Sequence, residues 1–537
     1  MSEPTFYLRQ NVKVEPLFNQ WYAWAQLIAP ASAAMNIANL HLKIMKSYVA
    51  APQVHANAVK NPKMLGGPFI DYDGGRVEEI RELMEQTATK QVHMIRFADA
   101  VKELDELLQR EAKGYSLEPL YPAVPPELRG YVELVYDLNN HPSIKFIEGL
   151  LYHSPYYDPS LQSLALSLID SDDRAFSLST PRLRDEKTLH LKIPFCHRGI
   201  DELFRMKTEP KTLGYISELL GLTPDDQELF TTFLTEEPPP QSRRYDGEGV
   251  RVRYFGHATV LVETRDVSLL LDPVLSYKYE NGIDRYTYLD LPESIDYVLI
   301  THAHQDHIMF ETLLQLRHKI KNIVLPRSKG GCLEDPSIKM LLQQIGFKNI
   351  LELEDLEVIE IPGGSITGVP FMGEHADCNI ASKIAHLVRL GGKSFLYAAD
   401  SNNIEPMLYD RLAPIIGDVD VLFLGMECDG APMSWLLGPL MTMRIDRKMD
   451  QSRRFSGSDY ERGIGIVNQL NAKEVYVYAM GQEPWLTYVS SVKYADDSNP
   501  IVASNKLIED CCGRSIIADR LYGTKELVYC PATQASA

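Results

Sequence analysis

The sequence predicts a two-part α/β protein, in which a mainly helical N-terminal part precedes a layered domain of strands and helices. Three observations lead to this prediction: apolar residues at helical spacing in the first half, a break rich in proline and glycine near residue 240, and short β-branched runs after that break. The length of 537 residues also exceeds what one hydrophobic core usually supports, so two domains are expected.

The clearest helical pattern of the first half runs from Val77 to Lys113. Apolar residues recur there every three or four positions, which is the period of a helix with one buried face. The stretch from Glu236 to Gly249 has three prolines, several charges and no apolar period, which is typical of a linker. We therefore expect an accessory domain in residues 1–240 and a second domain, which carries the candidate chemistry, in residues 241–530.

The second half contains short runs of β-branched and aromatic residues that end in Gly, Asp or His, and these runs predict buried or half-buried strands. Stretches with helical spacing, Glu311 to Lys319 and Asp459 to Leu470, separate some of the runs, so a layered α/β domain is favoured over a pure sandwich. The main runs are Val250–Thr264, Val267–Leu275, Ile295–His307, Ser394–Ser401, Val419–Asp429 and Glu474–Gly481.

Composition excludes several classes of protein. The formal net charge of −19 argues against a general nucleic-acid binder, because phosphate contacts need an excess of Lys and Arg. No apolar run reaches the roughly 18 residues of a membrane-spanning helix, so no membrane association is expected. The cysteines are scattered and form no CxxC pair, which fits a reducing, cytoplasmic location. They are Cys196, Cys332, Cys378, Cys428, Cys511, Cys512 and Cys530.

Four potential metal ligands lie within six residues, directly after an apolar run: His302, His304, Asp306 and His307. At the end of a strand, residues two apart project to the same side, so the first two histidines can converge on one metal. The other two, in the following turn, can reach a second metal. Neutral imidazoles and a carboxylate suit zinc, iron or manganese, so the segment predicts a two-metal site.

This segment resembles the metallo-β-lactamase superfamily, whose HxHxDH motif it matches at every defined position. The flanking runs Tyr254–Glu263 and Leu269–Leu275 agree with that family as well. The resemblance implies that the second domain is an αββα sandwich. Asp272 could accept a hydrogen bond from the outer nitrogen of a metal-bound histidine, or it could only cap a turn before Pro273.

The later superfamily motifs depart from the hydrolytic pattern. Where hydrolytic members carry a third-motif histidine, this chain offers Glu374 or His375. Asp400 follows an apolar run, at the place of the bridging carboxylate. No histidine occurs after His386, and Met480 lies near the place of the last ligand. The second metal is therefore expected to have an open coordination position.

These departures resemble one branch of the superfamily, which contains the di-iron oxygenase that β-hydroxylates an aminoacyl group in chloramphenicol biosynthesis. In that branch a helical N-terminal domain precedes the metallo-β-lactamase domain, and a Glu replaces the third-motif histidine. The resemblance implies that Glu374 and Asp400 are ligands with a part in catalysis. One metal would then bind His302, His304, Glu374 and Asp400, and the other Asp306, His307 and the bridging Asp400.

The resemblance also implies the cofactors and partners. These are two iron ions, with zinc or manganese as alternatives, O2 as co-substrate and an external electron donor protein. The substrate is expected to be an amino acid held as a thioester on the carrier domain of a nonribosomal peptide synthetase, and the chain could act as a homodimer. One alternative is a dinuclear hydrolase of the thioesterase or lactonase type, which shares nearly every ligand. A carrier-binding scaffold with a structural metal is a third hypothesis.

A few other residues have two interpretations each. His257 could lie under the metal site or be a structural histidine beside a glycine turn. Asp429 and Trp435 could contact substrate or belong to a connecting loop. The run from Arg444 to Arg454 holds five basic residues, which could face an acidic carrier or its phosphopantetheine phosphate, or could form a solvated helix face. Cys378 is expected to be a small buried side chain.

Overall fold

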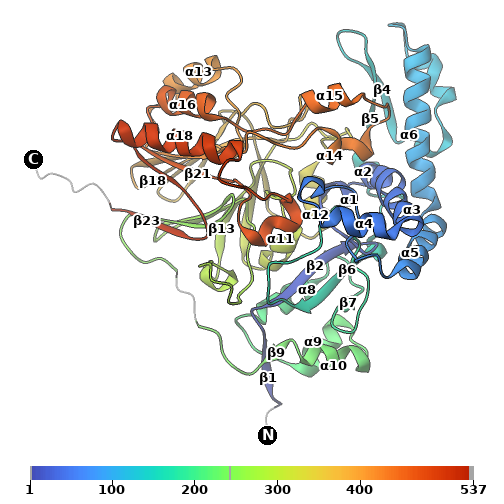
Figure 1. Ribbon diagram of the computed structural model, residues 1–537, viewed down its shortest axis with the longest axis horizontal. Helices are drawn as coiled ribbons and strands as arrows, with labels where there is room; N and C mark the ends of the chain where they lie inside the picture. Colours follow the sequence, from blue (N-terminus) through green and yellow to red (C-terminus); the bar gives the residue numbers. More distant parts are fainter. Residues whose placement is uncertain (1–2, 241–243, 531–537) are drawn as a thin grey trace, which may run out of the picture.

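The structure, a computed structural model, describes residues 3–240 and 244–530. Figure 1 shows an N-terminal half of helices and small sheets, blue to green, that lies against a strand-rich C-terminal half, green to red. The predicted linker at 236–249 has no helix or strand in its described part, and its residues 241–243 lie outside the described residues. No helix in the described part of the chain is long and apolar enough to cross a membrane.

Two seven-stranded sheets form the centre of the C-terminal half. Each sheet has antiparallel strands on one side and parallel strands on the other. The first has the order β15-β14-β13-β12-β11-β10-β23, with strands Ile350–Leu353, Ile320–Pro326, Ile295–Leu299, Ser268–Leu271, Thr259–Glu263, Val250–Gly256 and Lys525–Tyr529. The second has the order β16-β17-β18-β19-β20-β21-β22, with strands Val358–Ile361, Gly364–Val369, Ala385–Leu390, Lys393–Tyr397, Val421–Gly425, Glu474–Tyr478 and Ile517–Arg520.

A hydrophobic core lies between the two sheets, where buried side chains such as Val260 and Val388 meet. Helices α11 (Phe310–Leu316) and α12 (Ile338–Gln344) lie outside the first sheet. Helices α13 (Met407–Ile416), α16 (Tyr460–Gln469) and α18 (Asn499–Gly513) lie outside the second. Because helices cover both sheets, the central strands are buried on two faces. Their sequences are therefore almost continuous apolar runs. The four layers are the αββα sandwich that the sequence predicts.

The two helices predicted in this half are present. Helix α11 begins one residue before the predicted stretch 311–319 and ends within it, and α16 falls within 459–470. Helix α16 begins where it does because the Asp459 side chain accepts a hydrogen bond from the Arg462 backbone N–H, which satisfies a donor at the helix start.

The N-terminal half contains more helical than strand residues, as predicted. The pattern at 77–113 forms two helices, α5 (Val77–Lys90) and α6 (Val92–Glu111), with a break at Gln91. A four-stranded antiparallel sheet, β3-β2-β6-β7, accompanies the helices and is not indicated by the helical period. The remaining helices are α1 Ala25–Ile28, α2 Pro30–Asn36, α3 Leu42–Ala50, α4 Pro52–Val59, α7 Glu148–Leu151, α8 Arg198–Arg205, α9 Leu213–Leu220 and α10 Pro224–Thr231. The strands are β1 Thr5–Leu8, β2 Val12–Phe18, β3 Trp21–Tyr22, β4 Val132–Tyr136, β5 Pro142–Phe146, β6 Gln162–Leu168, β7 Leu189–Leu191, β8 Lys211–Thr212 and β9 Leu234–Thr235.

One hydrophobic cluster extends through both halves. It contains Trp21 and Phe97 of the N-terminal half together with Leu313 and Leu341 of the C-terminal half. Helix α11 is therefore enclosed between the first sheet and the N-terminal half, and all of its residues are buried. This enclosure fixes the start of α11, which directly follows the HxHxDH segment.

Candidate metal centre

The HxHxDH segment lies in the loop between β13 and α11. A turn closes the loop, because the His307 and Ile308 backbone N–H groups both donate to the His304 carbonyl oxygen, at 3.0 Å each. The side chains of His302 and His307 are fully buried, while that of His304 is partly open to a cavity. The loop thus holds its imidazoles at the carboxyl end of the parallel strands, where α/β proteins usually place their sites.

The structure brings all six predicted ligands together. His304 Nδ1 lies 2.8 Å from Glu374 Oε1, and His302 Nε2 lies 3.7 Å from Glu374 Oε2. Asp400 Oδ2 lies 3.6 Å from His302 Nε2 and 3.1 Å from His307 Nε2. Three overlapping groups have donor atoms close enough to hold a metal ion: His302, His304 and Glu374; His302, His307 and Asp400; and His257, Asp306 and His307.

Glu374 and Asp400, which lie far from the HxHxDH segment in the sequence, reach the centre from loops with unusual backbone features. Glu374 has a φ of +63°, in the left-handed region that non-glycine residues rarely adopt. Asp400 follows β19, and a Cβ on Gly425 would lie 2.6 Å from Asp400 Oδ1 and 2.7 Å from the Ala399 carbonyl oxygen. Gly425 is therefore needed for the Asp400 loop to pack against β20.

Several atoms of the centre are buried without a hydrogen-bonding partner: His302 Nε2, His304 Nε2, His307 Nε2, Glu374 Oε2 and Asp400 Oδ1. Each unsatisfied buried polar group costs about 1–3 kcal/mol, so a fold does not usually collect them in one place. Imidazole nitrogens and carboxylate oxygens that face one another are a donor set for divalent metals, including iron. The residues present therefore fit a pair of iron ions.

The electrostatics of the centre also favour a cation. Burial raises the pKa of Glu374 to about 7, although His304 partly opposes that rise. Burial and the neighbouring histidines hold the pKa of His302 well below its usual range, so its imidazole is neutral and keeps a lone pair. A third carboxyl, Glu427, has its pKa raised well above the usual value by burial and by Asp400. A bound metal would offset this concentration of carboxylates.

Asp272 contacts the outer nitrogen of a candidate ligand histidine, which is one of the two roles that the sequence left open. Its Oδ2 lies 2.9 Å from His307 Nδ1 and accepts a hydrogen bond from the Thr301 hydroxyl at 2.6 Å. Because Asp272 accepts from Nδ1, the proton of His307 is held there and its Nε2 keeps a lone pair toward Asp400. The carboxylate therefore orients one imidazole of the centre.

His257 is a residue of the centre that the sequence interpretation did not select. Its Nδ1 accepts a hydrogen bond from the Gly481 N–H at 3.1 Å, and its Nε2 lies 3.3 Å from Asp306 Oδ2. With Nδ1 acting as an acceptor, the neutral ring carries its proton on Nε2, toward the carboxylate. Although His257 belongs to one of the three groups, an Nε2 that carries the proton has no lone pair for a metal, so His257 is placed to position Asp306 and not to act as a ligand. The only sequence signal is its place in the GHAT turn after β10.

Glu374 and His375, the two candidate ligands of the third motif, differ in their contacts. His375 is buried beside the centre and stacks on His304, with ring centroids 4.7 Å apart, but it belongs to none of the three candidate groups. Glu374 belongs to one of them.

The Met480 side chain packs in the apolar cluster between the second sheet and its helices, with Leu396 and Val477, and does not line the metal cavity.

A cavity of about 310 Å³ opens above the centre. His304, Asp306, Glu374 and Asp400 line its floor, and its walls include Glu427, Asp429, Trp435 and Arg454. Asp429 and Trp435, both left open by the sequence, therefore border the space in which a substrate would lie.

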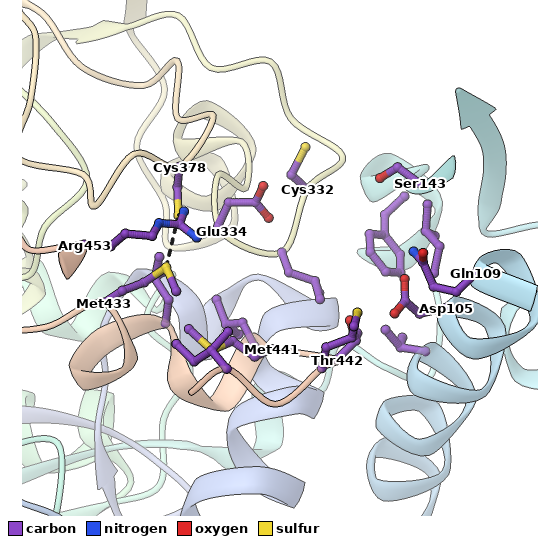
Figure 2. Close-up of a pocket in the computed structure, with 18 residues that line it drawn as sticks. Asp105, Gln109, Ser143, Cys332, Glu334, Cys378, Met433, Met441, Thr442 and Arg453 are labelled. Atoms are coloured by element: carbon purple, nitrogen blue, oxygen red, sulfur yellow. Dashed lines mark hydrogen bonds between the residues drawn. The ribbon is translucent and has the colours of Figure 1, made fainter. Parts of the chain in front are cut away.

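The basic run at 444–454 is divided between two surroundings. Figure 2 shows a second cavity, of about 430 Å³, which Arg453 and Cys378 both line. Arg453 Nη2 lies 3.3 Å from Cys378 Sγ, and its Nε donates to the Ala376 carbonyl oxygen. Arg444, by contrast, is exposed and forms no ion pair with any described residue. This second cavity shares no lining residue with the metal cavity.

Comparisons with known proteins agree with this geometry. The family described as diiron non-heme beta-hydroxylase N-terminal domain matches residues 7–238, and the beta-lactamase superfamily domain matches residues 268–453. The 4-amino-L-phenylalanyl-[CmlP-peptidyl-carrier-protein] 3-hydroxylase of Streptomyces venezuelae is 38% identical over 528 residues, which cover 96% of this chain and 98% of that protein.

A solved structure extends the similarity to the whole fold. The crystal structure of CmlA, a diiron beta-hydroxylase from Streptomyces venezuelae, matches with a TM-score of 0.92 at 37% identity and covers 98% of this chain and 100% of that one. A mutant of the CmlA beta-hydroxylase matches with a TM-score of 0.90 at 36% identity, again over 98% of this chain and 100% of that one. With this coverage in sequence and in structure, the chain belongs to the diiron non-heme β-hydroxylases that join a specific N-terminal domain to a metallo-β-lactamase domain.

Proposed function

We propose that this chain hydroxylates the β-carbon of an amino acid held as a thioester on a peptidyl carrier domain of a nonribosomal peptide synthetase. The relative with 38% identity is named for this reaction on 4-amino-L-phenylalanine. The observation that carries the proposal is the buried contact of Glu374 with His302 and His304, where hydrolytic members of the superfamily have a histidine. A carboxylate at this place increases anionic oxygen donation and favours iron over zinc.

The proposed ligands follow from the distances. His302, His304 and Glu374 would hold one iron and Asp306 and His307 the other, with Asp400 as a ligand shared by both. Support comes from the unpartnered buried atoms and from Asp400 Oδ2, which lies within 3.6 Å of imidazole nitrogens on both sides. No histidine of the C-terminal strands would join Asp306, His307 and Asp400 as a ligand, because no histidine follows His386.

The protein's own residues position the reactants. When bound, the two iron ions supply the redox chemistry that activates O2. Asp272 and His257 orient His307 and Asp306, and Trp435 with the apolar Leu178 and Leu436 forms a wall that limits water access. Overall, one Cβ–H bond is replaced by a C–O bond, and the second oxygen atom leaves as water after uptake of two electrons and two protons. An external electron donor is therefore required.

Residues 1–240 form an accessory domain that shapes access to the centre, and residues 241–530 form the catalytic domain. The hydrophobic cluster that both halves share would hold the accessory domain against the catalytic domain. The seven cysteines are all free, which supports a reducing, cytoplasmic compartment. A homodimer stays a prediction, to be checked by light scattering.

The decisive experiment uses the iron-loaded protein and a panel of aminoacyl carrier domains that includes 4-amino-L-phenylalanyl. The protein is reduced without oxygen and then exposed to O2. We expect about two iron ions per chain and a product heavier by one oxygen atom on the carrier-bound amino acid. A zinc-loaded protein serves as control. Release of the free amino acid by the zinc form, with no hydroxylation by the iron form, would establish the hydrolase alternative.

A further inference from the structure

A third cavity, of about 550 Å³, lies between the two halves and borders the metal cavity. Its walls come from α2, α3 and the π-helix η1 (Ile37–His41) between them, and from residues 432–439. It shares five lining residues with the metal cavity: Gly66, Leu178, Pro432, Trp435 and Leu436. The cavity in Figure 2 shares none, so this one is the extension of the metal cavity.

Trp435 separates the two spaces. Its indole Nε1 donates a hydrogen bond to the Gly66 carbonyl oxygen at 2.9 Å, and its ring lies 6.0 Å from that of Phe176. Gly66 has a φ of +72°, and a Cβ there would approach both Trp435 Nε1 and Ser491 Cβ to 3.1 Å. The absence of a side chain at Gly66 keeps the passage beside Trp435 open.

The apolar cavity contains one unsatisfied polar group. Asn36 is fully buried and lines the cavity; its Nδ2 donates to the Ser32 carbonyl oxygen, while its Oδ1 has no hydrogen-bonding partner. A buried acceptor of this kind costs about 1–3 kcal/mol unless a donor reaches it. The adjoining π-helix is also a feature that is found frequently at functional sites. A ligand with an amide N–H would satisfy Asn36.

Positive charge lies at the outer end of the cavity. Lys43, on α3, is exposed and lines the cavity, and partial burial together with Lys102 and Arg444 lowers its pKa. Neither Lys43 nor Arg444 forms an ion pair within the described residues, and the nearest carboxylate to Lys102 is Asp99 at 4.0 Å. In a chain of net charge −19, three neighbouring cations with so little compensation favour an anionic ligand.

From these features we infer that the cavity holds the 4′-phosphopantetheine arm of the carrier domain, a conclusion that rests on the proposed function. The arm has a phosphodiester at one end, two amides in the middle and a thioester at the other end. The phosphate lies at Lys43, with Lys102 and Arg444 nearby, and an amide N–H donates to Asn36 Oδ1. The thioester passes Trp435, so that the aminoacyl group reaches the metal cavity. The phosphate, an amide and the thioester of the arm would thus each contact a part of the cavity with matching chemistry.

The test compares 4′-phosphopantetheine with pantetheine as competitive inhibitors of carrier-bound turnover. Wild-type enzyme should bind the phosphorylated form roughly tenfold more tightly, because a charge-assisted contact is added. Lys43→Glu should abolish that difference and raise KM for the carrier-bound substrate while leaving kcat near the wild-type value. Lys46→Glu is the matched control, since Lys46 is exposed on the same helix but does not line the cavity.

The possible results of this test distinguish failure of the arm site from failure of the proposed function. Equal inhibition of wild type by the two compounds, or equal effects of the Lys43 and Lys46 variants, would overturn the arm site. Turnover of a free aminoacyl-phosphopantetheine thioester, as fast as the carrier-bound form and with the same Lys43 dependence, would support the arm site but contradict the need for a carrier. No hydroxylation of any loaded carrier by wild type would remove the proposed function itself.

Discussion

Two buried polar clusters lie near the start of α11. They differ in whether their polar atoms have hydrogen-bonding partners within the protein. In the first, which we term the Glu311 network, Glu311 Oε1 accepts from the Tyr277 hydroxyl at 2.6 Å, and Oε2 accepts from the Tyr22 hydroxyl at 2.8 Å and from Arg174 Nη2 at 2.7 Å. In the metal centre, a few residues earlier, buried nitrogen and oxygen atoms have no hydrogen-bonding partner among the described residues.

This difference distinguishes a structural cluster, which is buried throughout, from a functional one, in which His304 and Asp306 are partly open to the metal cavity. In the Glu311 network, Arg174 also pairs with Glu15 at 2.8 Å, so carboxylates and cations compensate one another within the protein. In the metal centre, Asp306, Glu374 and Asp400 lie among imidazoles and near a further carboxyl, Glu427, and they form no ion pair with an Arg or Lys of the described residues. Changes in the first cluster should therefore reduce stability, and changes in the second should reduce metal binding and turnover.

The largest effect is expected for Asp400→Asn. Loss of the bridging carboxylate should lower turnover at least about a thousandfold, equivalent to about 4 kcal/mol of transition-state stabilisation. The Tm of the metal-free protein should stay equal or rise, because one of several crowded, buried carboxylates is removed. Iron content, O2-dependent turnover and the Tm of the metal-free protein would be measured. A large fall in that Tm would mean that Asp400 is mainly structural.

Arg174→Met tests the other cluster. It leaves Glu15 and Glu311 buried with less compensation, and breaking a buried ion pair in this way costs about 3–5 kcal/mol. We expect the Tm to fall in the metal-free and iron-loaded proteins alike, while the folded fraction still binds iron. If the variant lost iron and kept its Tm, the Glu311 network would belong to the metal centre and the comparison would fail.

His257→Leu tests whether a buried histidine beside the metal centre supports iron binding or only the fold. Because His257 Nε2 lies 3.3 Å from Asp306 Oδ2 and we expect it to position that carboxylate, loss of His257 should weaken iron binding about tenfold to a hundredfold. His386→Leu is the matched control: His386 is also fully buried, but its Nε2 lies 2.9 Å from the Ile300 carbonyl oxygen and contacts no candidate ligand. Chelator competition would measure iron affinity in both variants. Equal affinities would assign His257 a structural role.

The smallest effect is expected for Lys207→Met, and it depends on pH. Burial lowers the pKa of Lys207 to about 7, between the rings of Tyr277 and Tyr288. Between this value and the ordinary pKa near 10.5, the unfolded chain binds more protons, so wild-type stability rises with pH. The Met variant should be more stable at pH 7 by about 1–2 kcal/mol, and the advantage should shrink toward pH 9. A Tm difference that is constant with pH would contradict the shift.

The sequence by itself determined much of the C-terminal half. The periods of apolar residues predicted α11, α16 and the buried strands, because a strand between two helical layers must be apolar on both faces. The HxHxDH segment predicted that its four residues lie close together, as they do, because they are neighbours in the chain and the local geometry of a strand end and a turn is enough to group them. In the N-terminal half, helical spacing predicted α5 and α6 but gave no sign of the sheet formed by β2, β3, β6 and β7.

Tertiary structure decided what depends on distant residues. Whether Glu374 or His375 joins the histidines depends on a left-handed backbone position at Glu374, which adjacent residues do not reveal. The role of His257 depends on Gly481, more than 200 positions away, whose N–H fixes the tautomer of the ring. The cavity that ends at Lys43 exists only where the two halves meet. Local periodicity encodes elements, but the protonation of a ring and the shape of a cavity arise from contacts between elements, so only the folded chain specifies them.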